Sequence, residues 1–195
     1  MNANGSVEDR LTSEEKTALL RLARRSIEAG VGDQPPPDFT GLDLTPPLLA
    51  PGAAFVTLTI DGALRGCIGA LEPYQSLVED VREHAAAAAL DDYRFPPLTA
   101  AELPRIHIEI SRLTLPVALD YADAADLVAK LRPGVDGVIL RDGSRRATFL
   151  PQVWEKVQSA EDFLDNLCYK MGASPDLWRR KHLEVLVYQV EEFHE

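Results

Sequence analysis

The sequence has 195 residues, of which 46% are hydrophobic and 26% charged, and its formal net charge is -11. This balance is typical of one folded domain with a real core, so neither disulfides nor metals are needed to stabilise it. The negative charge excludes nucleic acids and anionic membranes as expected partners, because phosphate groups bind clustered Lys and Arg side chains. Two cysteines, a polar N-terminus and the lack of an apolar run of about 18 residues favour a cytoplasmic protein.

The N-terminal part is predicted to contain a flexible segment, a helix and a long loop. Residues 1–10 are polar, and we expect them to be flexible. A helix runs from a Thr12/Glu15 capping box to Gly30–Gly32. Its apolar face carries Leu19, Leu22, Ala23 and Ile27. Residues 33–52 are rich in proline, which fixes φ and removes a hydrogen-bond donor, so they are predicted to be a wrapping loop.

A β-hairpin and a second helix are predicted next. Residues 54–60 and 63–71 alternate in polarity and are joined by the turn signal Asp61-Gly62. The helix begins at a second capping box, formed by Ser76 and Glu79. It contains the run Ala85–Ala89, whose small side chains let another backbone approach closely.

The rest of the chain is predicted to mix strands with short helices, without an internal repeat. The predicted elements are a strand at 106–113, a helix at 123–131, a hairpin at 137–141 and 145–150, helices from Gln152 and Ser159, a helical turn at Pro175 and a last strand at 184–192. Because regular βαβ alternation is lacking, the fold class is α+β, with a mainly antiparallel sheet flanked by helices. We expect one domain over residues 1–195, with a smaller lobe.

The strand Leu64–Gly69 is the best candidate functional element. Two glycines flank Cys67, and glycine inside a strand usually marks a bulge or the close approach of another segment. A cysteine near an arginine can be a nucleophile. Cysteine is also among the residues most often buried as a small hydrophobe, so we favour a close-packed structural or recognition strand.

The register of the hairpin decides which way Cys67 points. A three-residue loop with Gly62 in the left-handed conformation places Thr57 opposite Arg65, and we prefer this register because its faces are consistent. The core face then carries Val56, Leu58, Leu64 and Ile68, and the other face carries Arg65 and Cys67. A two-residue turn would instead bring Cys67 inside with the core residues.

Polar residues on the strand from Ile106 offer a second hypothesis. Alternation places His107 and Glu109 on one face, opposite three isoleucines. If this strand joins the hairpin, a Cys–His–carboxylate set with Cys67 is conceivable, although any polar strand face produces this spacing. The sequence lacks the Pro-Cys-x-x-Cys of a zinc deaminase.

Several other residues receive structural interpretations. Asp92 and Arg94, beside Phe95, are interpreted as an ion pair that fixes a loop, with the charged rim of a pocket as the alternative. Glu109 could pair with Arg65 or Arg94, which would give it a structural role. The packing residues are expected to be Trp154, Cys168 and Trp178. Phosphate-loop, dinucleotide-binding, zinc-protease and serine-hydrolase motifs are absent, so no cofactor or metal is expected. No disulfide is expected either, because cytosolic proteins seldom keep one and the two cysteines are predicted on a strand and in a helix core.

The hexapeptide Leu64–Gly69 resembles that of the AMMECR domain family, whose prokaryotic members are called AmmeMemoRadiSam system protein A. The similarity runs from about Phe55 to Phe193. The other matching segments are Asp92–Leu98, Glu109–Ser111 with Leu113-Thr114, Gly134–Val138, Thr148–Trp154, Phe163-Leu164 and Lys170–Gly172. Tyr93 stands where the family usually has proline, and His107 is not part of the family pattern.

This resemblance implies a two-lobed α+β fold and a cytoplasmic protein, but it implies no reaction. The family's system name implies a Memo-like protein and a radical S-adenosylmethionine enzyme as partners, and the chain lacks an iron–sulfur motif of its own. Our leading hypothesis is an accessory protein that binds a partner or an unknown small molecule. The alternative is an enzyme with Cys67 as nucleophile or redox thiol. The candidate binding residues are Leu64, Arg65, Gly66, Cys67, Ile68, Gly69, Asp92, Arg94, Phe95 and Glu109.

Overall fold

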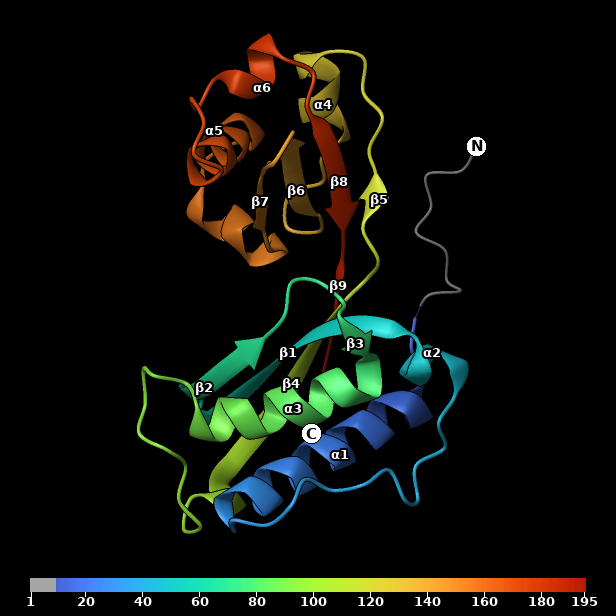
Figure 1. The fold of residues 1–195 in the computed structure, drawn as a ribbon. Helices are drawn as coiled ribbons and strands as arrows, with labels where there is room; N and C mark the ends of the chain where they lie inside the picture. The colour runs from blue at the N-terminus through green and yellow to red at the C-terminus, as the bar shows by residue number, and fades with distance from the viewer. Residues whose placement is uncertain (1–9) are drawn as a thin grey trace. The chain divides into compact units, whose positions relative to one another are not determined.

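The computed structural model describes residues 10–195 and consists of two compact units (Figure 1). Unit 1 extends to Thr114 and also contains Glu191–Glu195, and unit 2 is Leu115–Val190. The segment expected to be flexible lies outside the described residues except for Arg10. No helix in residues 10–195 is long and apolar enough to cross a membrane.

Unit 1 contains a sheet with the strand order β2-β1-β4-β9, and β3 pairs with β1 at one end. Strand β1 is antiparallel to β2, β3 and β4. The elements are α1 (Ser13–Val31), α2 (Pro46–Leu49), β1 (Pro51–Ile60), β2 (Ala63–Gly69), β3 (Gln75–Ser76), α3 (Leu77–Leu90), the 3-10 helix η2 (Leu103–Arg105), β4 (Ile106–Leu113) and β9 (Val190–His194).

The helix starts differ in how they are capped. At α1, the Thr12 hydroxyl accepts a hydrogen bond from the Glu15 backbone and the Glu15 carboxylate accepts one from the Thr12 backbone, which confirms the first capping box. At α3, the Ser76 hydroxyl donates to the Glu79 carboxylate at 2.8 Å. The second capping box is therefore wrong, because these two side chains bond to each other and not to the backbone.

The proline-rich stretch contains a short helix that was not predicted. Helix α2 begins at Pro46, where the first turn needs no backbone donor, so proline is well tolerated. Leu48 of this helix is fully buried in the core of unit 1. The stretch is thus anchored by a buried side chain.

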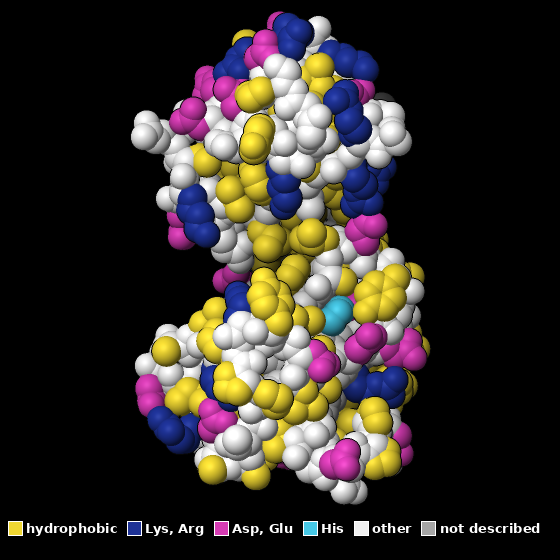
Figure 2. All heavy atoms as spheres, turned by 60° about the vertical axis from the view of Figure 1, so that its left-hand side comes forward, with side chains coloured by type: hydrophobic (Ala, Val, Ile, Leu, Met, Phe, Trp, Pro, Cys, Tyr) yellow, Lys and Arg dark blue, Asp and Glu magenta, His cyan; other side chains and the backbone are white. Residues whose placement is uncertain are grey.

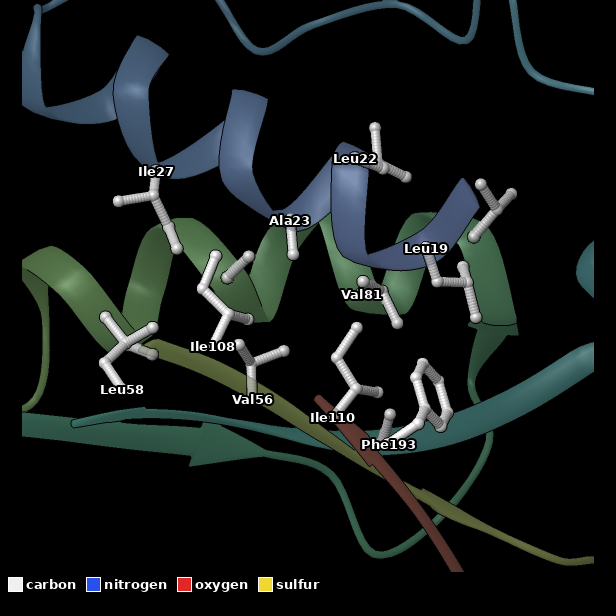
Figure 3. Close-up of a cluster of buried hydrophobic side chains, with 14 of the residues drawn as sticks. Leu19, Leu22, Ala23, Ile27, Val56, Leu58, Val81, Ile108, Ile110 and Phe193 are labelled. Atoms are coloured by element: carbon white, nitrogen blue, oxygen red, sulfur yellow. The ribbon is translucent and has the colours of Figure 1, made fainter. Parts of the chain in front are cut away.

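The core of unit 1 lies between the sheet and helices α1 and α3 (Figure 3). Strands β1 and β4 direct alternate apolar side chains toward the helices, and the helices return a stripe of aliphatic residues. The fully buried residues drawn at this contact include Leu19, Leu22, Ala23, Ile27, Val56, Leu58, Val81, Ile108 and Ile110. The face of the sheet that points away from these helices, called here the outer face, carries Phe55, Thr57, Cys67, His107 and Glu109.

Unit 2 contains a second sheet, of order β5-β8-β6-β7. Its elements are β5 (Val117–Ala118), α4 (Ala124–Lys130), β6 (Gly137–Asp142), β7 (Arg145–Phe149), the 3-10 helix η3 (Pro151–Lys156), α5 (Ala160–Lys170), α6 (Leu177–Arg180) and β8 (Glu184–Tyr188). Trp154, Cys168 and Trp178 are buried in its core, which confirms their packing role. The predicted α+β class with antiparallel sheets flanked by helices is also confirmed.

The predicted last strand, residues 184–192, is wrong in one respect. It is two strands, with β8 pairing with β6 in the second sheet and β9 lying next to β4 in the first. The sequence does not show this change because only Gln189 separates the two strands, with no glycine or proline to mark a break. A strand's choice of partner depends on tertiary contacts that periodicity does not encode.

Candidate functional site

The first hairpin turns in two residues, contrary to the preferred register. Asp61 and Gly62 have φ angles of 51° and 78°, both in the left-handed region that a type I′ turn requires. Ile60 therefore pairs with Ala63, and Thr57 pairs with Cys67. The predicted three-residue loop, with Thr57 opposite Arg65, is wrong.

A β-bulge at Arg65 restores the predicted direction of Cys67. Leu58 pairs with Gly66 but Thr59 pairs with Leu64, so Arg65 has no counterpart on β1. The extra residue shifts the alternation by one position, so Cys67 points to the outer face even though the turn is short. Leu64, expected on the core face, is instead 43% exposed.

Both glycines of the strand mark close approaches, as predicted. A side-chain Cβ at Gly66 would lie 2.0 Å from the Ala88 carbonyl oxygen, so α3 rests directly on β2 through its alanine run. A Cβ at Gly69 would lie 2.4 Å from the Ala54 carbonyl oxygen and 2.5 Å from atoms of Phe55. Side chains at these positions are excluded by neighbouring backbone, which cannot move aside as a flexible side chain does.

The backbone of Cys67 is held by an ion pair that follows α3. Cys67 N donates to Asp92 Oδ2 at 2.8 Å, and Arg94 Nη2 donates to the Cys67 carbonyl oxygen at 3.3 Å. Arg94 also donates to Asp92 from Nε at 2.9 Å and from Nη2 at 2.6 Å. Strand β2 lies at the end of its sheet, so these side chains take the place of a neighbouring strand. The expected ion pair is confirmed.

Arg65 is held by a partner that the sequence analysis did not identify. Its Nε and Nη2 donate to the Glu102 carboxylate at 2.8 and 3.2 Å, and Nη1 donates to the Pro96 carbonyl oxygen at 2.9 Å. The suggested pairing of Glu109 with Arg65 or Arg94 is therefore wrong. Glu102 follows Thr99, whose backbone and hydroxyl both donate to it, and this Thr-x-x-Glu spacing is the signal that could have found it.

We refer to residues 91–102 as the edge loop, because hydrogen bonds from Cys67 to Asp92 and from Arg65 to Glu102 hold this segment along β2. Phe95, the remaining candidate in this loop, is partly buried, and the Arg94 guanidinium lies 5.6 Å from the centre of its ring. The Leu98 backbone donates to Ala89 of α3 at 2.8 Å. The candidate residues Asp92, Arg94 and Phe95 are thus brought beside the Leu64–Gly69 strand.

On the outer face, the thiol of Cys67 lies in a row with a hydroxyl and a carboxylate. Thr57 pairs with Cys67 on one side and with Glu109 on the other. The Thr57 hydroxyl donates to Cys67 Sγ at 3.3 Å. All three residues are partly exposed. Thr57 was missed as a site residue because its only signal was alternation in β1.

His107 does not complete a catalytic set with Cys67. It pairs with Thr59, one row away from Thr57, and β4 is two strands from β2. Two strand spacings amount to about 10 Å, which exceeds the reach of a direct hydrogen bond. In residues 10–195, no group of three or more His, Cys, Asp and Glu side chains is arranged to hold a metal ion.

The bonded carboxylates beside β2 predict a loss of stability in acid. Hydrogen bonds from the Arg65 side chain, and then from Thr99, lower the pKa of Glu102 to about 2. Hydrogen bonds from Arg94 lower the pKa of Asp92 as well. In the unfolded chain both groups bind protons at higher pH, so their contribution is complete above about pH 4.5 and is lost as the pH falls toward 2.

Urea unfolding between pH 7 and pH 2.5 tests this expectation. The wild type should lose stability steadily below about pH 4.5. Glu102→Gln should show a shallower decline, because the variant lacks one of the carboxyl groups whose pKa is lowered by folding. Glu155→Gln, an exposed residue of unit 2, serves as the control and should keep the wild-type slope. Equal slopes for all three proteins would contradict the role given to Glu102.

Comparison with known proteins finds similarity over nearly the whole chain. The AMMECR1 family model matches residues 20–193. A protein of Methanothermobacter thermautotrophicus is 39% identical over 189 residues, which cover 95% of this chain and 96% of that protein. A protein of Methanosarcina mazei is 38% identical over 188 residues, which cover 95% and 94%.

A solved structure supports the same assignment. The crystal structure of an uncharacterized protein from Pyrococcus horikoshii matches with a TM-score of 0.74 at 33% identity, and the match covers 96% of this chain and 94% of that one. The family model and the relatives span both units. The chain belongs to the AMMECR1 family.

Proposed function

We propose that this protein is an accessory component that binds a partner protein through the Leu64–Gly69 strand. Its expected partners are a Memo-like protein and a radical S-adenosylmethionine enzyme, and it acts with them in the cytoplasm, where a thiol such as Cys67 stays reduced. An unknown small molecule is the other ligand considered for this strand.

One observation supports binding over catalysis: Arg65, Asp92 and Arg94, the charged groups next to Cys67 on β2 and the edge loop, are already paired. Asp92 accepts from Arg94 and from the Cys67 backbone, and Arg65 is bound to Glu102. These bonds hold the strand in one conformation and leave neither Asp92 nor Glu102 free to act as a base. A strand fixed in advance loses little conformational entropy on binding, which favours recognition.

The surface beside β2 has the mixed character of a protein interface. Leu64 is 43% exposed and Tyr93, in the edge loop, is 94% exposed. Figure 2 views the molecule from the side on which β2 lies in Figure 1, and hydrophobic side chains lie among charged ones over this side of unit 1. Exposed aromatic and aliphatic side chains within a polar surround are typical anchors for a partner protein.

The alternative function, an enzyme with Cys67 as nucleophile or redox thiol, has one supporting observation. The sulfur is on a partly exposed residue and accepts a hydrogen bond from Thr57, so a reactant can approach it. The row that it forms with Thr57 and Glu109 contains no histidine, however, and His107 pairs with Thr59 on β4, two strands from β2. The geometry supports the binding role better.

Binding of the purified Memo-like protein and radical enzyme of the same organism, measured by calorimetry, tests the proposal. We expect Leu64→Thr to weaken binding about tenfold, because a buried interface anchor contributes on the order of 1–2 kcal/mol. Threonine keeps the β-propensity of the strand, so folding should be unaffected. The matched control is Leu49→Thr on α2, a leucine of similar exposure at 52%, which should bind as the wild type does.

The same measurement separates the two functions. Cys67→Ser should retain binding if the strand is a recognition element, whereas an enzyme would lose its turnover with the thiol. Failure of both partners to bind, or equal effects of the two leucine variants, would refute the proposed role of the strand.

A further inference from the structure

The first half of helix α3 carries a buried Asp–His pair whose hydrogen-bonding capacity is only partly used. Asp80 is fully buried, and its Oδ2 accepts a hydrogen bond from Ala54 N at 2.8 Å. His84, one turn later, is 7% exposed, and its Nδ1 lies 3.2 Å from the same Oδ2. Within residues 10–195, neither Asp80 Oδ1 nor His84 Nδ1 has a hydrogen-bond partner. Since a buried polar group without a partner costs free energy, this pair needs an explanation beyond packing.

The other nitrogen of the imidazole faces a tyrosine hydroxyl. Tyr74 Oη lies 3.4 Å from His84 Nε2 and 3.2 Å from Glu83 Oε2, and Tyr74 is 60% exposed. The Asp80 carboxylate favours the neutral tautomer with the proton on Nδ1, because that N–H then faces a negative charge. Nε2 is thereby left as an acceptor for the Tyr74 hydroxyl. Hydroxyl, imidazole and buried carboxylate follow one another in the order that makes a hydroxyl nucleophilic.

We propose that Tyr74 is a nucleophile for an uncharged activated acyl donor, with His84 as its general base and Asp80 as the residue that positions the imidazole. The Tyr74 oxygen forms a bond to the acyl carbon while the phenolic proton moves to His84 Nε2. The bond from the acyl carbon to the leaving group then breaks, and the leaving group takes that proton. The product is a tyrosine ester. This modification site is independent of the proposed binding function.

The charges around the hydroxyl determine the class of donor. The Glu83 carboxylate lies beside the Tyr74 hydroxyl, and the Asp80 carboxylate lies behind the imidazole. The whole chain also has a net charge of -11. A phosphoryl or nucleotidyl donor would bring further negative charge next to these carboxylates, and like-charge repulsion disfavours its approach. An uncharged acyl group avoids this repulsion.

His84 is favoured over Glu83 as the base. Imidazole is a stronger base than a glutamate carboxylate by about 2 pKa units in model peptides, so it removes a phenolic proton more readily. Glu83 is also exposed and already accepts a hydrogen bond from Gln75 Nε2 at 2.7 Å. His84 has no such competing partner for Nε2 among the described residues.

Acetylation by N-acetylimidazole at neutral pH tests the proposal, with Tyr93 as the internal comparison because it is 94% exposed. Burial raises the pKa of Tyr74, and the carboxylates of Glu83 and Asp80 raise it further. Without a base, Tyr74 would therefore react more slowly than Tyr93. With His84 as the base, we expect Tyr74 to react at least about tenfold faster, as measured for each tyrosine by peptide mass spectrometry.

Variants of the three side chains separate their roles. His84→Ala keeps the helix propensity of α3 and should lower the rate at Tyr74 to that of Tyr93 or below, and added imidazole should restore it. Glu83→Gln should keep the wild-type rate. Asp80→Asn should slow acetylation, and nitrogen NMR of labelled histidine should show the His84 proton leaving Nδ1. A merely structural Asp80 would leave this tautomer unchanged.

The remaining outcomes contradict the proposal at defined points. A wild-type Tyr74 that reacts no faster than Tyr93 overturns it, and this comparison needs no variant. An unchanged rate in folded His84→Ala, or a lost rate in Glu83→Gln, refutes His84 as the base. Acetyl phosphate carries the same acyl group on a charged donor, and a preference for it at Tyr74 would refute the uncharged class. Partner binding by the Leu64–Gly69 strand is measured separately, by calorimetry, so the two proposals fail independently.

Discussion

Asp92→Ala is expected to lower the free energy of unfolding by about 2–3 kcal/mol, because the variant leaves a backbone donor without a partner and removes a charged hydrogen-bond acceptor. Asp92 is only 4% exposed and bonds both the Cys67 backbone and the Arg94 side chain. Arg94 itself keeps contact with water in the variant, since its side chain is 43% exposed, and this limits the loss of stability. The measurement is urea unfolding at pH 7, combined with amide hydrogen exchange at Cys67.

The neighbouring acid provides the control for this prediction. Asp91→Ala changes the same charge one residue earlier, at an exposed position, and should alter stability by less than about 0.5 kcal/mol. Asp92→Asn keeps an acceptor for the Cys67 backbone and should fall between the two. If both alanine variants were equally stable and the Cys67 amide stayed protected, the edge loop would not hold β2 as described.

Gly66→Ala is expected to be at least as damaging, with a loss of about 3 kcal/mol from overpacking. The added methyl group would lie 2.0 Å from the Ala88 carbonyl oxygen, and this backbone atom in the last turn of α3 can move only if the end of the helix moves. The expected result is a large drop in the urea midpoint. The change should be largest for probes of α3 and β2, which are in direct contact.

A second glycine separates this clash from the general effect of adding a methyl group. At Gly30, near the end of α1, a Cβ would meet the terminal carbon of Leu90 at 2.9 Å, and this flexible side chain can turn aside. Alanine also favours the helix by up to about 1 kcal/mol, so Gly30→Ala should be close to neutral. A Gly66→Ala protein as stable as Gly30→Ala would contradict the close packing of α3 on β2.

Local patterns were sufficient where neighbouring residues decide the structure. The alternation of Ile106–Leu113 predicted β4 with its observed bounds, and Asp61-Gly62 predicted the position of the hairpin turn. Thr12 and Glu15 predicted the start of α1. In each case the physical cause, side-chain alternation, a left-handed turn or a capping bond, acts over a few residues, so the sequence displays it directly.

The details of the candidate site depended on residues distant in sequence. The partner of Arg65 is Glu102, 37 positions away, and no periodicity links them. The bulge at Arg65 was invisible because the sequence gives the number of residues in β2 but not which of them lacks a partner on β1. The path of the edge loop and the position of β9 in the first sheet also depend on contacts between residues that are distant in sequence. The sequence by itself determined most of the helices and strands, including the Gly-flanked strand. Only the tertiary structure decided which charged groups are paired, as Arg65 is with Glu102, because pairing depends on where separate segments meet in space.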